Sequence, residues 1–464
     1  MNKVSCILRS QLGRNSVQPH HRTHLIERGK HLSEFYTIEN ISFKDSKNRV
    51  LNRCLVYANA ENILEKICDE RGFENPGLVK LMIDGGQGFL KLSLSILPPN
   101  YNPITDSASK DSEDSDKDAI NTDMKGNNFP FMQIKLTGVR KLVILAIVPD
   151  IPETNSNLKI LFEKTGINDI SFKLAADFKM LYVCLGLQNS VAIYPCPYCE
   201  ITLNDLRDLE KSVFEKNFEI PKERTFGTLK KDYNKFQSEF FSKKKDARYC
   251  HSTINQCVIQ EGENISILEK CPMDELHIME GIVNHIFFMG LVIKIGRENA
   301  MKWPKKINVV PVLYQGEKFE GNGCRALIKS SHILQDKEIM GIQPLIVQPF
   351  VATFQALDKL VSACFGSQPV TGDITSLLRC FSKAYLALEI STTVKVHVLI
   401  THLIPCLMNL GGQGLGVYST QAGESIHKYF EKNFWAKYKV NSLSHPEYGK
   451  RLLNATIEFS SKNI

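Results

Sequence analysis

The sequence lacks several features that would assign it to a membrane-embedded or secreted class of protein. It contains no run of about 18 apolar residues, which a membrane-spanning helix needs, so we expect no membrane partner. Its first residues, Met-Asn-Lys-Val-Ser-Cys-Ile-Leu-Arg, include no apolar stretch long enough for a secretory signal. Charge of one sign hardly predominates: 57 basic and 50 acidic residues give a net charge of +7. That balance is compatible with binding to a phosphate backbone but does not indicate it.

The composition that is present is typical of a folded intracellular protein. The 464 residues are 43% hydrophobic and 23% charged, which allows a large core. A chain of this length can form two or three domains, or one catalytic domain with a large insertion. Its 13 cysteines are scattered and odd in number, which indicates reduced thiols of the cytosol or nucleus. Closely spaced cysteines are then candidates for metal binding.

The pattern of apolar residues predicts an α/β core. Segment 78–96 is an apolar run, a glycine-rich turn at 85–88 and an alternating run, which predicts a β-hairpin. A third strand is predicted over 141–148, a helix over 155–165, and a fourth strand that begins at residue 170 and reaches Asp177. The order β-β-β-α-β, with acidic residues on the first and fourth strands, is that of an RNase H-like mixed sheet.

Composition shifts along the chain predict its domain organisation. We expect a mixed N-terminal region (1–75), a first part of the core (76–200), a large and mainly helical insertion (201–395), and a closing part (396–464). Within these, a helix is predicted over 61–71, and the polar, acidic stretch 101–128 is expected to be a disordered loop. Glu424 lies in the segment 419–435, whose apolar residues have helical spacing.

One motif and one histidine pair are candidates for metal binding. Cys196-Pro-Tyr-Cys199 has the spacing of half a tetrahedral zinc site, although a chance pair of core thiols is the alternative. His397 and His402 could supply the other half. On an ideal helix they lie about 140° apart, so we expect the backbone to change course there, near Pro405. Taken alone, each histidine is interpreted as a core histidine whose hydrogen bonds are satisfied.

Three carboxylates are candidates for catalytic metal ligands. Asp84 ends an apolar strand, and Asp177 interrupts the apolar run Leu174-Ala-Ala-Asp-Phe-Lys-Met. Burying an acid in such a run is costly unless it is paired or binds a cation. Glu424 follows Gly423, with few other charges nearby. Two strands and a helix can bring three acids to a pair of divalent ions about 3.5–4 Å apart. For any one of them in isolation, a capped or solvated acid is the favoured interpretation.

Several short segments together resemble the catalytic core of the large subunit of the V(D)J recombinase and of the related Transib-type transposases. In that family an Asp precedes a zinc-binding Cys-x-x-Cys at the spacing found here, where Cys196 lies 19 residues after Asp177. The other similar segments are Asp84-Gly-Gly-Gln-Gly88, Asp274-Glu-Leu-His-Ile-Met-Glu-Gly281, Val396-His-Val-Leu-Ile-Thr-His-Leu-Ile-Pro405 and Gly416-Val-Tyr-Ser-Thr-Gln-Ala-Gly-Glu-Ser-Ile-His-Lys-Tyr-Phe430. The chain also resembles a set of uncharacterised, transposon-derived invertebrate proteins.

The resemblance covers roughly residues 78–460, loosely in the middle, and implies a function. It implies one structural zinc ion shared by Cys196, Cys199, His397 and His402, which would join the two ends of the insertion. It also implies Asp84, Asp177 and Glu424 as ligands of two catalytic Mg²⁺ or Mn²⁺ ions. The implied reaction is nicking and strand transfer on double-stranded DNA by a nuclear homodimer, a DDE-type transposase. The sequence identifies no accessory subunit.

The sequence also departs from this family. The basic, dimerising DNA-binding module that precedes the family's core has no counterpart in residues 1–75, which we interpret as a truncated DNA-binding or dimerisation part. Two alternatives to an active transposase follow. The chain could be a catalytically silent, domesticated DNA-binding or chromatin protein on the same scaffold, or a zinc-stabilised adaptor between proteins. The retained carboxylates favour the enzyme, and the missing basic module favours the silent protein.

Overall fold

A mixed six-stranded sheet forms the core of the protein in the computed structural model, which describes residues 29–97, 142–208, 221–239, 243–313 and 316–463. The strands are β1 (Tyr36–Lys44), β2 (Val50–Ala58), β3 (Leu78–Gly86), β4 (Phe89–Leu97), β5 (Leu142–Pro149) and β6 (Lys173–Ala175), in the order β1-β2-β5-β4-β3-β6. Four neighbouring pairs are antiparallel, and β6 pairs with β3 in parallel. The predicted α/β class is confirmed.

The hairpin β3–β4 places the first candidate acid. Its register is continuous from the pair Leu78–Leu97 to the pair Gly86–Phe89. Gln87 and Gly88 both have positive φ, at 50° and 74°, as tight two-residue hairpin turns require. Every residue of β4 and of β5 is buried, because helices cover both faces of the sheet. The hairpin predicted from the sequence is confirmed.

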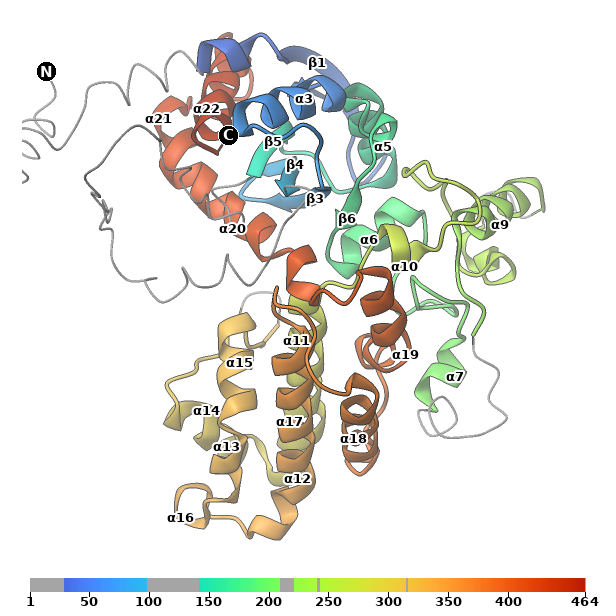
Figure 1. Ribbon diagram of the computed structural model, residues 1–464, viewed down its shortest axis with the longest axis vertical. Helices are drawn as coiled ribbons and strands as arrows, with labels where there is room; N and C mark the ends of the chain where they lie inside the picture. Colours follow the sequence, from blue (N-terminus) through green and yellow to red (C-terminus); the bar gives the residue numbers. More distant parts are fainter. Residues whose placement is uncertain (1–28, 98–141, 209–220, 240–242, 314–315, 464) are drawn as a thin grey trace, which may run out of the picture.

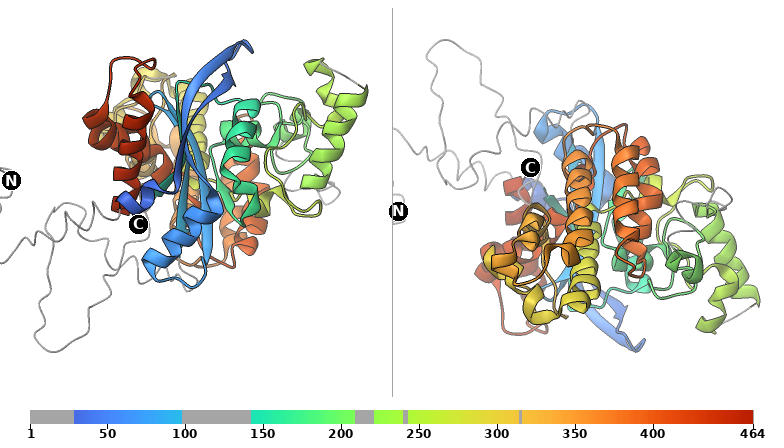
Figure 2. Two further views of the ribbon diagram at one scale, coloured as in Figure 1. Left: turned by 90° about the horizontal axis from the view of Figure 1, so that it is seen from above. Right: turned by 90° about the horizontal axis from the view of Figure 1, so that it is seen from below.

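Helices lie on both faces of the sheet. Figure 2 shows α5 (Asn155–Thr165) on one side of the strands and the C-terminal helix α22 (Tyr448–Asn463) on the other. Tyr36 in β1 donates a hydrogen bond of 2.6 Å to the Ile144 carbonyl and lies 3.1 Å from Ser460 Oγ, which ties α22 to the strands. Helices α3 (Ala60–Arg71) and α5 were both predicted, and they begin after the N-caps Asn59 and Thr154.

Two sequence predictions differ from the structure in the core. Strands β1 and β2 belong to the same sheet as β3–β6, whereas residues 1–75 were predicted to be a separate region. The fourth strand is shorter than predicted: β6 ends at Ala175, and Asp177 is the N-cap of α6 (Phe178–Leu185). The predicted disordered loop 101–128 lies outside the described residues.

A helical region follows the core in sequence and forms a second body below the sheet in Figure 1, with α9 to one side. Its helices are α7 (Leu203–Arg207), α9 (Phe226–Glu239), η4 (Lys244–Cys250), α10 (Ile267–Lys270), α11 (Glu275–Asn284), η5 (His285–Leu291), α12 (Val292–Ile295), α13 (Arg297–Ala300), α14 (Lys302–Lys306), α15 (Gly321–Lys329), η6 (Ser331–Gln335), α16 (Lys337–Met340), α17 (Pro344–Cys364), α18 (Ile374–Leu386) and α19 (Val394–Asn409). This large, mainly helical region was predicted.

The chain then returns to the sheet. After the short turn η7 (Leu415–Tyr418), α20 (Gln421–Phe430) packs on β3 and continues through η8 (Glu431–Trp435) and α21 (Ala436–Tyr438) toward α22. Glu424 therefore lies on a helix that packs against the sheet, as we predicted.

One helical stretch of the described chain, Glu275–Ile295, would be long and apolar enough to cross a membrane by composition alone. Half of its most apolar window is buried inside the molecule. It comprises α11, η5 and α12, and α11 packs against α15 and α19 of the helical body.

Candidate active site and metal centre

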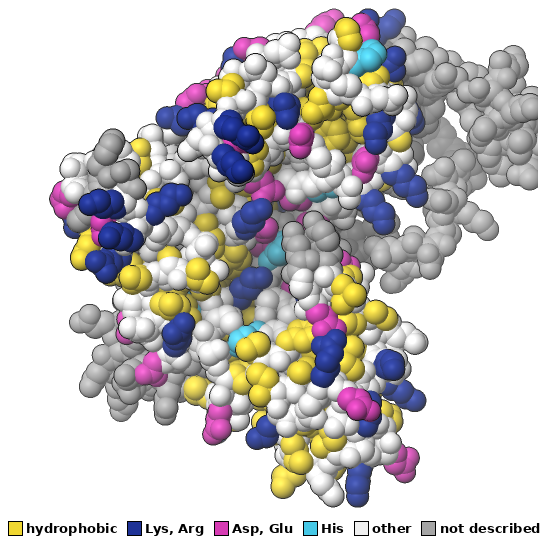
Figure 3. Space-filling model, turned by 180° about the vertical axis from the view of Figure 1, so that it is seen from behind, with side chains coloured by type: hydrophobic (Ala, Val, Ile, Leu, Met, Phe, Trp, Pro, Cys, Tyr) yellow, Lys and Arg dark blue, Asp and Glu magenta, His cyan; other side chains and the backbone are white. Residues whose placement is uncertain are grey.

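Three carboxylates from distant parts of the sequence converge on one small pocket. Asp84 lies near the end of β3, Asp177 follows the neighbouring strand β6, and Glu424 lies in the first turn of α20. The pocket is lined by Met82, Ile83, Asp84, Ala175, Asp177, His277, Thr420, Gly423 and Glu424. Figure 3 shows a hollow between the two bodies with acidic and histidine side chains in it and Lys and Arg side chains around it. The arrangement gathers negative charge at an open edge of the sheet.

Asp84 is held by a buried histidine and a buried lysine. His427 Nε2 lies 2.7 Å from Asp84 Oδ2 and is buried without a hydrogen-bond partner. His427 Nδ1 lies 2.5 Å from the Nζ of Lys91, which is opposite Asp84 on β4. Burial lowers the pKa of Lys91 to about 7, although Asp84 and Glu431 favour its charged form. A side chain at Gly86 would meet the His427 ring, since its Cβ would be 2.9 Å away.

Glu424 is held by a second histidine, which is partly buried. His277 Nε2 lies 2.9 Å from Glu424 Oε1, and His277 Nδ1 contacts Asp274 Oδ2. Asp274 also accepts hydrogen bonds of 3.1 Å and 2.9 Å from the backbone and hydroxyl of Thr420. Burial opposes the charged imidazolium, but Asp274 and Glu424 outweigh it and raise the pKa of His277 to about 10. His277 is therefore a cation that fixes the position of Glu424.

Asp177 is oriented by the helix that follows it. Its Oδ1 accepts a 2.6 Å hydrogen bond from the Met180 backbone, as an N-cap does. Lys179, the second residue of α6, forms an ion pair with Glu153. Hydrogen bonding to Glu153 raises the pKa of Lys179, and the charges of Asp177 and Asp84 act in the same direction. Lys179 is therefore close enough to Asp177 and Asp84 for their charges to act on it.

The two histidines were missed as functional residues, although the sequence carries a signal for them. Each follows an acid by three residues in the sequence, a spacing that can place two side chains on one helix face: His277 follows Asp274, and His427 follows Glu424. Only the first of these acid–histidine pairs makes its contact within the pair. Glu424 instead contacts His277, and His427 contacts Asp84, so the partners come from different elements. That exchange depends on the tertiary fold.

The pocket suits hard divalent cations by its donor set. Carboxylate oxygens are the ligands that Mg²⁺ and Mn²⁺ prefer. The Asp84 and Glu424 side chains are 31% and 44% exposed, so water or a substrate can reach them. These residues could therefore hold such ions.

A separate, fully buried group of four side chains could hold a zinc ion. Cys196 and Cys199 lie in the turn after α6, and His397 and His402 lie on α19. Cys196 Sγ is 3.5 Å from His402 Nε2, and Cys199 Sγ is 3.3 Å from His397 Nε2. All four donor atoms lie within 4.8 Å of one another. The group joins the beginning and the end of the helical region.

These distances match a tetrahedral zinc site. Zinc at about 2.3 Å from sulfur and about 2.0–2.1 Å from nitrogen keeps the two ligand atoms about 3.5 Å apart. Although burial opposes the thiolate, a hydrogen bond to Cys199 and the nearby His402 and His397 lower the pKa of Cys196. Burial raises the pKa of Cys199. Thr401 Oγ1 lies 3.2 Å from His397 Nδ1 and can orient that ring.

The backbone around the histidines differs from the prediction. Helix α19 does not change course between His397 and His402; it continues through Pro405 to Asn409. The two rings converge nevertheless, with centroids 5.2 Å apart and planes at 83°. Side-chain rotation therefore brings the two imidazole nitrogens within 4.8 Å of one another, and no break in the helix is needed.

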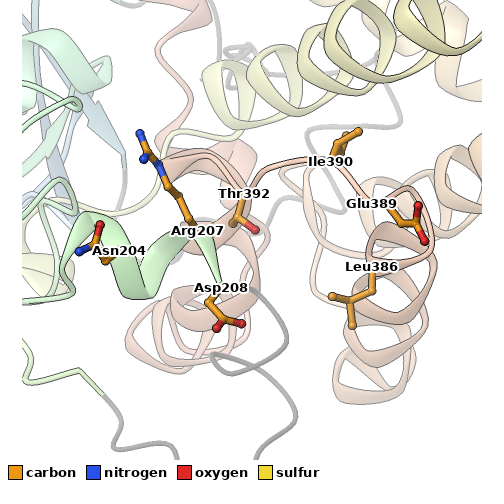
Figure 4. Close-up of a pocket in the computed structure, with 7 residues that line it drawn as sticks. All are labelled: Asn204, Arg207, Asp208, Leu386, Glu389, Ile390 and Thr392. Atoms are coloured by element: carbon orange, nitrogen blue, oxygen red, sulfur yellow. The ribbon is translucent and has the colours of Figure 1, made fainter.

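A larger hollow lies between α7 and the end of α18. It is lined by Asn204, Arg207, Asp208, Leu386, Glu389, Ile390 and Thr392. Figure 4 shows Arg207 and Glu389 pointing away from one another, so the charged groups do not converge. This hollow is less suited to chemistry than the acidic pocket.

Comparisons with known proteins add no relative from which a function could be inferred. No protein-family model matches the chain, and no curated protein matches it at a significant level. The interpretation of both sites therefore depends on their own residues and geometry.

Proposed function

We propose that this protein is a transposase-like DNA recombinase with an RNase H-like core, which catalyses metal-dependent DNA nicking and strand transfer. One observation carries the proposal: Asp84, Asp177 and Glu424 line a single pocket although they come from three elements far apart in sequence. Acids that merely cap helices or face solvent have no reason to converge. Plasmid nicking by the parent protein and by a Glu424 variant is the test.

The strand order supports the RNase H-like part of the proposal. Three consecutive antiparallel strands, β3, β4 and β5, are followed by a helix and by β6, which pairs in parallel with β3. This is the β-β-β-α-β arrangement expected from the sequence. The hairpin β1–β2 extends the sheet beyond β5.

The chain's own residues have distinct tasks in this mechanism. Asp84, Asp177 and Glu424 bind the cations, while His277 positions Glu424 and His427 positions Asp84. Bound Mg²⁺ or Mn²⁺ supplies charge stabilisation at the attacking and leaving oxygens of phosphoryl transfer. Lys179 lies where it can attract a phosphodiester toward the pocket. A zinc ion held by Cys196, Cys199, His397 and His402 would have a structural task, because it would join the two ends of the helical region.

The partners and the compartment follow from the same proposal. The substrate would be double-stranded DNA, the protein would act in the nucleus, and a homodimer would supply one active site for each DNA end. Nicking that shows no preference for double-stranded over single-stranded DNA would contradict the proposed substrate. A monomer that acts on both DNA ends would contradict the proposed homodimer.

Replacing His277 by asparagine is expected to slow nicking without unfolding the protein. The amide keeps hydrogen-bonding capacity but loses the charge that positions Glu424. Partners that orient metal ligands are typically worth about 10–100-fold in metal affinity or activity. The measurement is the plasmid-nicking rate across a Mn²⁺ titration, with the exposed His445→Asn as the control. An unchanged rate at limiting Mn²⁺ would remove His277 from the site.

DNA affinity is expected to fall steeply with salt. Lys and Arg that contact phosphates release counterions, so the logarithm of affinity falls linearly with the logarithm of salt concentration. Lys179→Gln should lower the slope by about 1 if Lys179 contacts one phosphate. Fluorescence anisotropy with duplex DNA in metal-free buffer measures this, with the exposed Lys159→Gln on α5 as the control. Binding that is absent or independent of salt would favour the protein–protein adaptor.

A further inference from the structure

Helix α9 and η4 form a small lobe beside the core. They pack around three buried residues, Phe236, Ala247 and Cys250, which form a hydrophobic cluster separate from the main core. Figure 1 shows α9 standing out to the side of the sheet and the helical body. A core this small contributes little stability, and small folded units are commonly reinforced by disulfides or metal ions. None of the described cysteines, Cys250 included, forms a disulfide.

Three potential ligands meet where this lobe joins the rest of the protein. Glu200 follows the Cys196–Cys199 turn, Asp232 lies on α9, and His251 follows η4. One donor atom from each lies within 4.8 Å of the others. His251 Nδ1 is 2.9 Å from Asp232 Oδ2, and His251 Nε2 is 3.6 Å from Glu200 Oε2. The imidazole ring therefore lies between two carboxylates.

Glu200 is the residue of this group whose buried carboxylate most needs a nearby cation. Its side chain is only 10% exposed, and its Oε1 is buried without a hydrogen-bond partner. The nearest cation, Lys222 Nζ, is 3.6 Å from Oε1 and is itself 68% exposed. Burying a carboxylate without hydrogen bonds is costly unless a cation compensates for the lost water.

The backbone holds His251 firmly in this position. Its φ and ψ of 45° and 41° are left-handed, and Ser252 also has positive φ, at 66°. Such strain persists only where neighbouring contacts enforce it. The His251 carbonyl accepts a 2.9 Å hydrogen bond from the buried Arg224, whose Nε also donates to the carbonyls of Cys196 and Cys199. One arginine thus links the Cys196–Cys199 turn to the backbone at His251.

We propose that Glu200 and His251 bind a second divalent transition-metal ion, with zinc as the matching probe. Asp232 accepts the Nδ1–H of His251, which leaves Nε2 free to bind metal; carboxylate–histidine–metal chains have this form. An ion at about 2.0–2.2 Å from nitrogen and oxygen separates them by about 3.0–3.6 Å, which includes the observed distance. His251 is 33% exposed, so water completes the coordination. The ion would fasten α9 and η4 to the zinc-binding turn.

Zinc stoichiometry tests the proposal without any assay of DNA chemistry. The parent protein, titrated with Zn²⁺ against a fluorescent chelator, should bind two ions per chain, the second more weakly than the first. His251→Gln should bind one, and Glu200→Gln should also bind one. Asp232→Asn should retain the second ion with an affinity about 10–100-fold lower, because Asp232 orients the ligand. The exposed His332→Gln should bind two.

Cobalt spectroscopy separates the two sites. Co²⁺ added in the second equivalent should give no new thiolate charge-transfer absorption, since Glu200 and His251 contain no sulfur. Circular dichroism and retention of the first zinc ion verify folding of each variant. A parent that binds only one zinc ion, or a folded His251→Gln and Glu200→Gln that both still bind two, would overturn the proposal.

Discussion

Replacing Glu424 by glutamine is expected to abolish metal-dependent nicking and leave the fold intact. The amide keeps the size of the side chain but binds Mg²⁺ poorly compared with a carboxylate. A residue that only orients a metal ligand is worth about 10–100-fold in activity, and the nicking rate of Glu424→Gln should fall by more than this. Stability should change little: Glu424 is 44% exposed, so solvent screens its ion pair with the partly buried His277, and screened pairs of this kind contribute about 0–1 kcal/mol.

Three measurements on one preparation decide this prediction. They are plasmid nicking with Mg²⁺ or Mn²⁺, thermal melting in metal-free buffer, and zinc content. Glu447→Gln, which changes an exposed glutamate before α22, is the matched control and should nick as the parent does. If Glu424→Gln nicks as fast as the parent, Glu424 is not a catalytic ligand. If the parent itself binds DNA but never nicks it, the catalytically silent DNA-binding protein is favoured.

Local sequence signals predicted the parts of the fold that depend on neighbours in the chain. The hairpin β3–β4 was found from alternation and a glycine turn, and α3 and α5 from helical spacing. Strand β1 was missed because only two of its nine residues, Tyr36 and Phe43, are buried. A strand at the edge of a sheet alternates weakly, so its sequence resembles a loop.

The candidate site was predicted to a similar degree. The cysteines and histidines of the zinc group do meet, as the resemblance implied, and the three acids line one pocket, while their role as catalytic ligands stays a prediction. The exchange of partners between Glu424, His277, His427 and Asp84 could not be predicted, because it joins elements more than 140 residues apart. Asp177 was expected within a strand, but its side chain satisfies the first turn of α6, which ends the strand at Ala175.

Replacing Cys196 by serine is expected to release zinc and destabilise the protein. Structural zinc contributes roughly 10–16 kcal/mol in small peptides, comparable with the whole stability of a domain, about 5–15 kcal/mol. Here a bound zinc ion would fasten the Cys196–Cys199 turn to α19, about two hundred residues later in the sequence. A loss of only about 4 kcal/mol would lower the melting temperature by about 8–16 °C for a domain of 150–250 residues.

The controls separate zinc from the thiol itself. Cys380→Ser, an exposed cysteine on α18, should keep zinc and melt as the parent does. Chelator treatment of the parent should reproduce the lowered melting temperature of Cys196→Ser, and adding Zn²⁺ back should restore the parent but not the variant. The two variants should therefore differ in opposite ways. Cys196→Ser should lower the zinc content and the melting temperature, whereas Glu424→Gln should keep both and lose nicking. A Cys196→Ser protein that keeps its full zinc content and melts with the parent would show that these four side chains do not share an ion.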